Sequence, residues 1–553
     1  MGYLKKIIKS FSRNERIVFA SAFLAFFISS LFLISSFFSA NTSLVAVAGG
    51  KYAEGAVGQP IFVNPIFSGS NEADQDLVEL IFGSLGEMAE SYKVSADGKT
   101  WLVRLKEGIR WDDGRQITSD DVIFTIGIIQ NADSRSPLYP MWQKVNPERI
   151  SELEFRLDLP EVYSFFQNTL DEFRPIPKHI FAGIPAENLR LSEYNLEPVG
   201  SGPFKFSSMS THRSGFIAEY RLARNNDFFG DRAYLDNFIF KFYENEKELM
   251  KAFNSGSIDG FGGLRAMDLA EIKISHQLFE MRMPRYYAVF FNTSAHPALK
   301  EKNVRLALNY ATDKSGIIQD VFGGKALSVD GPLIPGMSGY DPDVYPQEGF
   351  STEKANSILD NGGWVIEEDG VRAKTMNSGK VRLEFDLVVP AISFLTESAR
   401  IISENWAKIG VKANVIEYSV EKINEDAIRT RNYQMILFGN IFSNNGVPDL
   451  SSFWHSSERF YPGLNLALYE NRTADSLIES IREATDSNRK QSSLSSLQSL
   501  IVQDSPGVFL FSPNYFYVSK NSLGGFNERF ITLASKRFQN ISAWHTKTAR
   551  TFE

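Results

Sequence analysis

Apolar and polar residues recur along the chain with two periods, one typical of strands and one typical of helices. The strand period appears in TWLVRLKEG and LEFRLDLP, where every second residue is apolar. The stretch SDDVIFTIGIIQ begins with acidic residues, which favour a helix N-terminus, and continues with mostly apolar ones. The alternation of the two patterns along the chain predicts a mixed α/β protein.

The second half of the chain contains a strand-helix-strand unit. The pattern predicts a buried strand in RLEFDLVVP, a helix in ESARIISENWAKIGV that ends at Gly410, and a second strand in KANVIEY. Such a unit implies a parallel sheet. Upstream, KNVRLALNYATDKSGIIQDVFGG places apolar residues on one helical stripe, which predicts a helix that ends at Gly323-Gly324.

The first forty residues combine a basic segment with an apolar one. Residues 1–16 hold five basic side chains and one acidic one, whereas residues 17–40 carry no charge. About 20 apolar residues suffice to cross a bilayer as a helix. Because the basic flank precedes the span, we expect residues 1–16 to be cytoplasmic and residues 17–40 to form a transmembrane signal anchor. Residues 41–50 then form a linker to an exported body.

A cleaved signal peptide is the alternative to this anchor. The apolar region of a secretory signal typically runs for about 7–15 residues, and the longer span here favours an uncleaved anchor. The sequence Ala46-Val47-Ala48 nevertheless matches the A-x-A cleavage pattern. The body is therefore either held on the cell membrane by a single pass or released outside the cytoplasm.

Composition excludes several classes of site. The 553 residues include no Cys, which excludes disulfide scaffolds, thiol nucleophiles, Cys-ligated zinc and a lipid-modified cysteine anchor. The net charge is −8 despite the basic start, and an acidic body argues against nucleic-acid binding. Aromatic residues make up 13% of the chain, enough for large cores or an aromatic-lined cavity.

Common catalytic signatures are missing from the sequence. No P-loop, G-x-G-x-x-G, H-E-x-x-H or G-x-S-x-G motif occurs. Ser351 and Lys354 match an S-x-x-K pattern, but Ser351 is better placed as a helix N-cap. We therefore expect neither an enzyme nor a cofactor or metal site. A membrane-tethered hydrolase, the competing hypothesis, needs a nucleophile or two carboxylates held about 5–10 Å apart.

Five stretches occur in an order found in one family. They are QPIFVNPIFSGSNEADQDLVELIFGSL, DGKTWLVRLKEGIRWDDGRQITSDDVIFTI, PVGSGPFKF, YYAVFFNTSAHPALKEKNVRLALNYATDKSGII, and PDLSSFW with the downstream IVQDSPGVFLF. Over nearly all of residues 51–553 they resemble the bacterial extracellular solute-binding proteins of family 5. This is the oligopeptide- and dipeptide-binding type, which serves peptide, nickel and related ABC importers.

The resemblance implies a periplasmic-binding-protein-like fold, in which two α/β lobes are joined by two crossing strands and close over a ligand. It assigns lobe I to residues 51–85, 200–283 and 520–553, a small inserted domain to 86–199, and lobe II to 284–519. The implied function is capture of a peptide-like or other medium-sized solute for an ABC permease and ATPase. A sensory protein that reports the ligand to a membrane partner is the alternative.

Two loops are implied as ligand contacts. By resemblance the loop of Ser68, Gly69, Ser70 and Asn71 approaches the ligand backbone, although an ordinary turn before a helix fits these residues equally well. In MILFGNIFSNNGVPDLSSFW a buried strand runs into a polar loop, and ligands of open α/β sheets bind at such strand ends. The further expected contacts are Tyr287, Phe438, Asn440, Asn444, Asn445 and Asp449.

The polar loop departs from the family pattern at one position. In peptide-binding members a carboxylate pairs with the α-amino group of the ligand, and counting back from Pro448 places that position on Asn444. An amide cannot supply the charge, and charge-assisted hydrogen bonds are about twice as strong as neutral ones. Asp449, just past the turn, is placed either to compensate for the missing charge or to cap a helix.

Overall fold

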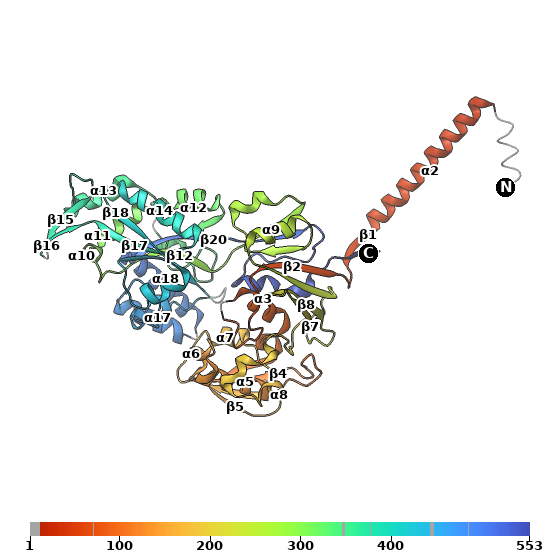
Figure 1. The fold of residues 1–553 in the computed structure, drawn as a ribbon, viewed down its shortest axis with the longest axis horizontal. Helices are drawn as coiled ribbons and strands as arrows, with labels where there is room; N and C mark the ends of the chain where they lie inside the picture. Colours follow the sequence, from red (N-terminus) through yellow and green to blue (C-terminus); the bar gives the residue numbers. More distant parts are fainter. Residues whose placement is uncertain are drawn as a thin grey trace.

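The computed structural model describes residues 12–69, 71–345, 349–377, 379–442, 447–484 and 486–552. Two lobes lie side by side, and a long helix projects from one of them (Figure 1). Each lobe has its own large β-sheet, and helices cover both sheets. This arrangement agrees with the two-lobe α/β fold predicted from the sequence.

The first lobe is built on a seven-stranded sheet with the order β11-β21-β10-β2-β9-β8-β7. β2 pairs in parallel with β9 and β10, and the remaining pairs are antiparallel. Helices α3 (Glu72–Ile81) and α9 (Glu246–Asn254) pack against it. The strands are β2 (Lys51–Val57), β7 (Phe204–Thr211), β8 (Ile217–Arg224), β9 (Asn237–Tyr243), β10 (Gly260–Gly262), β11 (His276–Met281) and β21 (Tyr515–Lys520).

A four-stranded antiparallel sheet lies beside the first lobe, in the order β3-β4-β6-β5. Its buried side chains and those of the seven-stranded sheet belong to one continuous hydrophobic core. Because interiors are close-packed, two sheets with a shared core are expected to move as one body. The elements of this part are α4 (Leu85–Met88), β3 (Ala89–Val94), β4 (Thr100–Leu105), α5 (Ser119–Gln130), α6 (Tyr139–Trp142), β5 (Asn146–Arg149), β6 (Glu154–Asp158), α7 (Phe166–Glu172) and α8 (Lys178–Phe181).

The second lobe is built on a six-stranded sheet with the order β13-β20-β12-β19-β17-β18. One face packs on α11, α13, α12 and α14, and the other packs on α16, α17 and α18, so each face has its own core. The strands are β12 (Arg285–Phe291), β13 (Ala326–Ser328), β17 (Glu384–Pro390), β18 (Lys412–Tyr418), β19 (Met435–Ile441) and β20 (Gly507–Pro513). The helices are α10 (Pro297–Lys300), α11 (Lys302–Tyr310), α12 (Lys314–Phe322), α13 (Thr352–Asn361), α14 (Ser393–Ala407), α15 (Val420–Ile423), α16 (Ser451–Trp454), α17 (Arg472–Glu483) and α18 (Ser487–Asp504). A small sheet of β14 (Val365–Ile366), β15 (Arg372–Met376) and β16 (Gly379–Arg382) lies at its far end (Figure 1).

The predicted strand-helix-strand unit is confirmed, because β17, α14 and β18 form it and the two strands pair in parallel. The helix predicted to run to Gly323 is wrong in one respect. It is broken into α11 and α12, because the side chain of Asp313 accepts a hydrogen bond from the Gly316 N–H and starts a new helix. Gly323 ends that second helix with φ +57°, a conformation that glycine adopts without strain.

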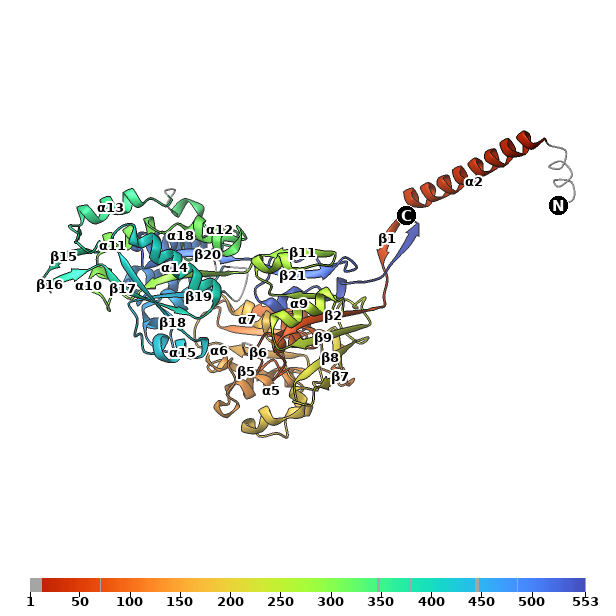
Figure 2. The same ribbon diagram turned by 45° about the horizontal axis from the view of Figure 1, so that its top comes forward.

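Two pairs of strands run from one lobe into the other (Figure 2). β11 continues into β12 through residues 282–284, and β20 continues into β21 through Asn514. In each lobe the two strands belong to the same sheet, since β11 pairs with β21 and β12 pairs with β20. β21 hydrogen-bonds within the seven-stranded sheet, although the sequence division assigns residues 515–519 to the second lobe.

A cluster of charges lies in the core of the first lobe. Arg537 donates to Asp76 Oδ1 at 2.8 Å and to Glu54 Oε1 at 3.1 Å, and Tyr517 donates to Glu54 Oε2 at 2.7 Å. All these side chains are buried. Burial raises the pKa of Glu54 to about 7, against the opposing effect of Arg537. The cluster joins β2, α3, β21 and the segment η8 (Ala534–Phe538), four parts of the chain that are distant in sequence.

The apolar N-terminal segment forms α2 (Arg13–Asn41), which is long and apolar enough to cross a membrane. It continues directly into β1 (Thr42–Ala46), which pairs antiparallel with β22 (Thr548–Phe552). The segment predicted as a linker therefore contains a hydrogen-bonded strand. Figure 1 shows this two-stranded ribbon between the helix and the first lobe.

Candidate functional site

The sequence-predicted contacts Tyr287, Phe438 and Asn440 lie on the two central strands of the second lobe. β12 and β19 pair so that Tyr287 faces Gly439 and Ala288 faces Phe438. Tyr287 packs against Phe394 of α14 and Phe511 of β20, on one face of the sheet. Phe438 packs on the opposite face. Since side chains alternate along a strand, Tyr287 and Phe438 lie on opposite faces of the sheet and are not brought together on one surface.

Asn440 is buried and takes part in a polar pair. Its Nδ2 donates to Tyr286 Oη at 3.2 Å, and the two residues face each other across β12 and β19. Burial raises the pKa of Tyr286 well above its ordinary value, so the phenol stays neutral. The next residue but one, Phe442, donates its N–H to Pro284 O at 2.8 Å, in the first crossing segment. The end of β19 is therefore tied to the junction between the lobes.

The predicted loop of the first lobe is held by local bonds. Asn71 caps α3, because its Oδ1 accepts from the Asp74 N–H at 3.1 Å while its Nδ2 donates to Gln59 O. Gln75 Nε2 donates to Gly69 O at 2.7 Å, and Ser68 donates its N–H to Asn64 O. Within the described residues, no hydrogen bond joins this loop to the second lobe. Ser70, Asn444 and Asn445 lie outside the described residues.

Asp449 lies at a contact between the lobes. Its Oδ1 accepts from the Ser451 N–H at 2.9 Å, a local bond just before α16, and its Oδ2 lies 3.3 Å from Arg482 Nε on α17. The charge of Asp449 adds to burial in raising the pKa of Tyr163, which precedes α7 in the first lobe. Asp449 does not cap α16, whose N-cap is Leu450, and its charge is paired with Arg482. Compensation for the charge missing at position 444 stays a prediction.

The segment from Tyr163 to Phe165 docks on helices α17 and α18. Ser164 donates its N–H to Arg482 O at 2.8 Å and its hydroxyl to Ile481 O at 3.0 Å, while Lys490 Nζ donates to Ser164 Oγ at 2.9 Å. The same ammonium lies 3.8 Å from the centroid of the Phe165 ring. Phe165 is 4% exposed and packs in the core of the second lobe, whereas its neighbour Phe166 packs in the core of the first. We call this docking the interlobe contact.

Two smaller polar contacts also join the lobes near the crossing strands. Lys325 Nζ lies 2.9 Å from Glu280 Oε2, and Asn514 Nδ2 donates to Glu280 Oε1 at 2.6 Å. Farther out, Arg265 Nη1 donates to Ser393 Oγ at 3.3 Å. These groups are largely exposed, and exposed ion pairs contribute little to stability. The interlobe contact differs from these because it includes the buried ring of Phe165.

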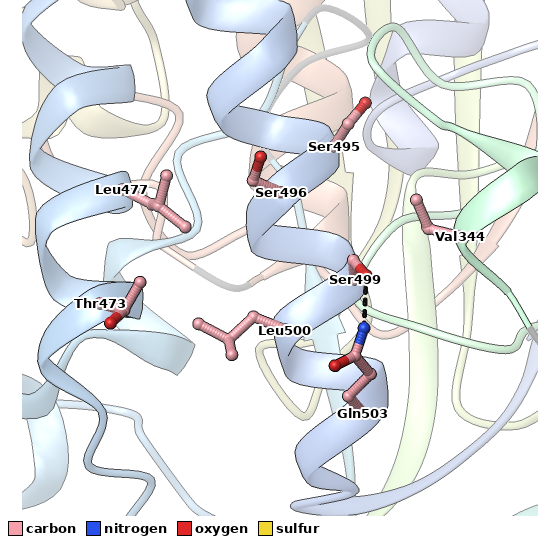
Figure 3. Close-up of a pocket in the computed structure, with 8 residues that line it drawn as sticks. All are labelled: Val344, Thr473, Leu477, Ser495, Ser496, Ser499, Leu500 and Gln503. Atoms are coloured by element: carbon pink, nitrogen blue, oxygen red, sulfur yellow. Dashed lines mark hydrogen bonds between the residues drawn. The ribbon is translucent and has the colours of Figure 1, made fainter.

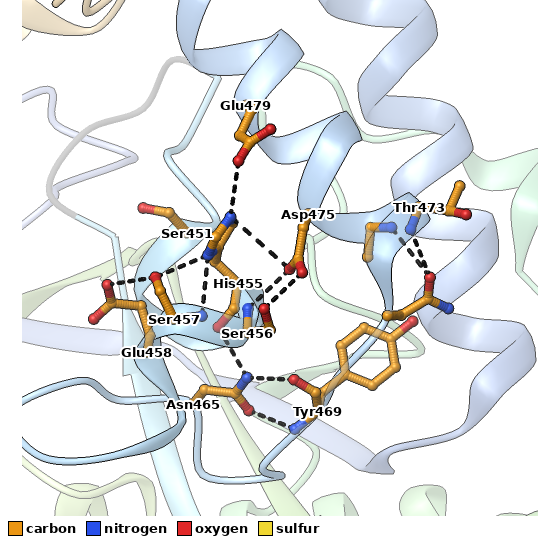
Figure 4. A network of polar contacts seen from close by, with 12 residues as sticks. Ser451, His455, Ser456, Ser457, Glu458, Asn465, Tyr469, Thr473, Asp475 and Glu479 are labelled. Atoms are coloured by element: carbon orange, nitrogen blue, oxygen red, sulfur yellow. Dashed lines mark hydrogen bonds and ion pairs between the residues drawn. The ribbon is translucent and has the colours of Figure 1, made fainter.

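The segment that follows the predicted ligand loop is fastened to α17 by a polar network around His455 (Figure 4). His455 Nε2 lies 3.5 Å from Glu479 Oε1 and 3.9 Å from Asp475 Oδ1, and its Nδ1 accepts from the Ser457 N–H. Asp475 also accepts from the Ser456 N–H at 2.8 Å. The imidazole thus serves as the cap of a short helical turn, and both its nitrogens face groups that fix its position.

A groove of about 460 Å³ lies elsewhere on the second lobe, between α17, α18 and the turn η5 (Pro342–Val344) (Figure 3). A valine and two leucines form its apolar part, and hydroxyl and amide groups form its polar part. None of the predicted ligand contacts lines it. Its lining residues are Val344, Thr473, Leu477, Ser495, Ser496, Ser499, Leu500 and Gln503.

Sequence reasoning missed Tyr163, Ser164, Phe165, Arg482 and Lys490. The only signal near the first three was an aromatic pair in a segment between a strand and a helix. Chemically, the interlobe contact brings together aromatic rings, a hydroxyl group and charged side chains. Across the described residues, no group of three or more His, Asp or Glu side chains is placed to hold a metal ion.

Comparison with known proteins places this geometry in one family. The model of the bacterial extracellular solute-binding proteins, family 5, matches residues 85–461. The oligopeptide-binding protein AppA of Bacillus subtilis is 26% identical over 526 residues, covering 90% of this chain and 91% of that protein.

Solved structures show the same fold. AppA from Bacillus subtilis in complex with a nonapeptide superposes with a TM-score of 0.70 at 25% identity, covering 91% of this chain and 99% of that one. The ABC transporter substrate-binding protein CtaP from Listeria monocytogenes superposes with a TM-score of 0.77 at 24% identity, covering 90% and 100% of the two chains. Both the resemblance seen in the sequence and the predicted two-lobe fold are confirmed: the chain belongs to the bacterial extracellular solute-binding proteins of family 5.

Proposed function

We propose that this protein captures a peptide-like or other medium-sized solute between its lobes and delivers it to an ABC permease and ATPase. The observation that carries the proposal is the pair of crossing strands. Two lobes with separate sheets, joined by β11-β12 and β20-β21, can rotate about residues 282–284 and Asn514 once the ring of Phe165 leaves the core of the second lobe. The protein performs no chemistry on the solute.

The ligand site lies at the junction of the lobes. Its second-lobe part is β19 with Phe438 and Asn440, the loop that contains Asn444 and Asn445, and Tyr287 on the neighbouring strand β12. Its first-lobe part is the loop from Ser68 to Asn71. Asp449 and Arg482 supply charge nearby, at 3.3 Å from each other, and the pair is neutral overall. A neutral pair favours ligands held by hydrogen bonds and apolar contacts over ligands held by one strong charge.

The division into lobes follows from the same proposal. Residues 51–85, 200–283 and 520–553 form lobe I together with β21, residues 86–199 form the inserted domain, and residues 284–514 form lobe II. Helix α2 stays attached as a single-pass anchor, with the basic segment in the cytoplasm and the body outside. This anchor replaces the lipidated cysteine that the chain lacks, and it keeps the body near its permease, which raises their effective concentration.

Calorimetric titration of the full chain in detergent with a panel of peptides tests the proposal. The panel pairs each free-amine peptide with its N-acetylated form, at lengths from two to nine residues. Binding of at least one peptide class with a negative heat-capacity change is the expected result, because closure buries apolar surface. Absence of binding across the panel would contradict capture of peptides and leave a non-peptide solute as the ligand class.

A further inference from the structure

The ribbon of β1 and β22 joins the membrane helix to the body along two chains. All five residues of β1 pair with β22, from Thr42 opposite Phe552 to Ala46 opposite Thr548. Among the described strands, β22 pairs with β1 alone. β1 starts at the residue that follows α2, so no free segment separates the helix from the ribbon. The tether is therefore not a single flexible chain.

Side chains fasten β22 to the last turn of α2. The rings of Phe38 and Phe552 lie 5.5 Å apart between centroids, and Arg550 Nη1 donates to Thr42 Oγ1 at 3.0 Å. Asn41 Nδ2 donates to Phe37 O at 2.8 Å and closes the helix end. The helix thus contacts both strands of the ribbon.

The other end of the ribbon is fixed on the first lobe. Gly49 donates its N–H to Tyr234 O at 2.7 Å, and Asp236 donates its N–H to Gly50 O at 3.0 Å. Both glycines have positive φ, and a Cβ on Gly50 would lie 2.6 Å from Thr546 Oγ1. Only glycine fits this turn without strain. The turn aims the ribbon away from the seven-stranded sheet (Figure 2).

The length of the helix locates the ribbon at the membrane surface. The 24 uncharged residues from 17 to 40 extend about 36 Å at 1.5 Å per residue, against a hydrocarbon core of about 30 Å. Phe38 therefore lies near the outer boundary of the core, and Phe552 lies against it. The side chains of Leu44 and Phe552 are 64% and 60% exposed. They lie on the same face of the ribbon, because Phe552 pairs with Thr42 and Thr42 is two residues from Leu44 in the same strand.

We propose that β1 and β22 form a rigid stalk that stays in the mature protein and holds the first lobe over the outer leaflet, with Leu44 and Phe552 in the lipid interface. The proposal rests on the proposed retention of α2. Cleavage after Ala46-Val47-Ala48 would remove the whole of β1 and leave β22 without its partner. The stalk fixes the orientation of the lobe toward the membrane, whereas a cleaved or flexibly tethered body would approach the permease in any orientation.

Cysteine cross-linking of the full chain in membranes tests the stalk, because the natural sequence has no Cys. Ser43→Cys with Thr551→Cys places two thiols on paired residues, and Ser43→Cys with Ala549→Cys places them two residues out of register. A disulfide needs Cα atoms within about 7 Å. We expect mild oxidation to link the first pair at least tenfold faster than the second, in a chain whose intact mass includes residues 1–48.

The outcomes separate the stalk from the anchor. If the intact chain links both cysteine pairs at the same rate, or links neither, the proposal of a stalk is wrong. The proposal that α2 is retained as an anchor is then unaffected. A mature chain that begins after Ala48 would overturn both.

A spin label on Phe552→Cys in nanodiscs tests the lipid contact. The control carries the label on Val365→Cys, an exposed site at the far end of the second lobe. We expect the label at 552 to be accessible to oxygen and shielded from a water-soluble nickel chelate, and the label at 365 to show the opposite. Equal exposure of both labels to the chelate would overturn the placement of Phe552 in the lipid interface.

Discussion

Replacement of Phe165 by alanine should separate the lobes without unfolding either of them. The ring is buried in the core of the second lobe but belongs to the chain of the first, so its removal weakens the interlobe contact alone. Burial of a phenylalanine side chain is worth about 1.5–3 kcal/mol. Loss of the cation–π contact with Lys490 adds about 0.5–1 kcal/mol. The sum of about 2–4 kcal/mol corresponds to a shift of roughly 30- to 700-fold toward separated lobes.

Pulsed electron paramagnetic resonance measures this shift directly. Spin labels on Leu191→Cys in the inserted domain and Val365→Cys in the second lobe use two exposed positions, and no natural cysteine interferes. The parent should give a narrow distribution of distances, and Phe165→Ala a broader one that extends to greater distances. Ligand affinity should fall in parallel, because binding must then supply the free energy that the contact supplied.

Phe166→Ala provides the matched control. This neighbouring ring is buried in the core of the first lobe, so its loss should lower the free energy of unfolding by about 3–5 kcal/mol and leave the distance between the lobes unchanged. Identical distance distributions for the parent and Phe165→Ala would refute the reasoning, since they would show that the docking of residues 163–165 contributes nothing to the relation of the lobes.

Three further predictions concern the buried charges and the ligand loop. Arg537→Met should lower the free energy of unfolding by about 3–5 kcal/mol, because it leaves Glu54 and Asp76 buried without a counter-charge. Urea titrations at pH 7 measure this change, and an unchanged unfolding midpoint would contradict it. The pKa of Glu54 is about 7 in the folded protein against an ordinary value of 4.5, so the folded state binds the extra proton and stability should fall as pH rises from about 4.5 to 7. Glu54→Gln should flatten that slope, and an equally steep slope in the variant would assign it to other groups. Asn444→Asp should strengthen binding of free-amine peptides about tenfold and leave N-acetylated peptides unaffected; equal affinities for both would show that this position does not contact the ligand amine.

The elements that could be predicted from the sequence are those with a sustained local pattern. The unit β17, α14 and β18 follows the expected periods because β17 is mostly buried, β18 alternates at the sheet edge and the helix has one apolar stripe. The break between α11 and α12 was missed because the apolar stripe continues across it. The capping side chain of Asp313 decides the break, and an Asp before a helical run was the available signal.

The contacts that join distant parts of the chain could not be predicted. Lys490 and Ser164 are 326 residues apart, and Arg550 and Thr42 are 508 apart, so no local period reports either pairing. The five-residue sequence of β1 is too short and too irregular in its pattern to indicate a strand. It is a strand because it pairs with β22. The family resemblance supplied the two-lobe fold, and it carried no information on the ribbon or on the interlobe contact.

Native mass spectrometry of the full chain, purified in mild detergent without denaturation, tests the central claim most directly. A protein that captures solutes between closing lobes should retain part of its ligand through purification. The account predicts adducts of peptide-like mass that disappear on denaturation and are reduced in Phe165→Ala. A protein that carries no adduct, and gains none after incubation with a fractionated peptide pool or cell extract, would contradict solute capture as its function.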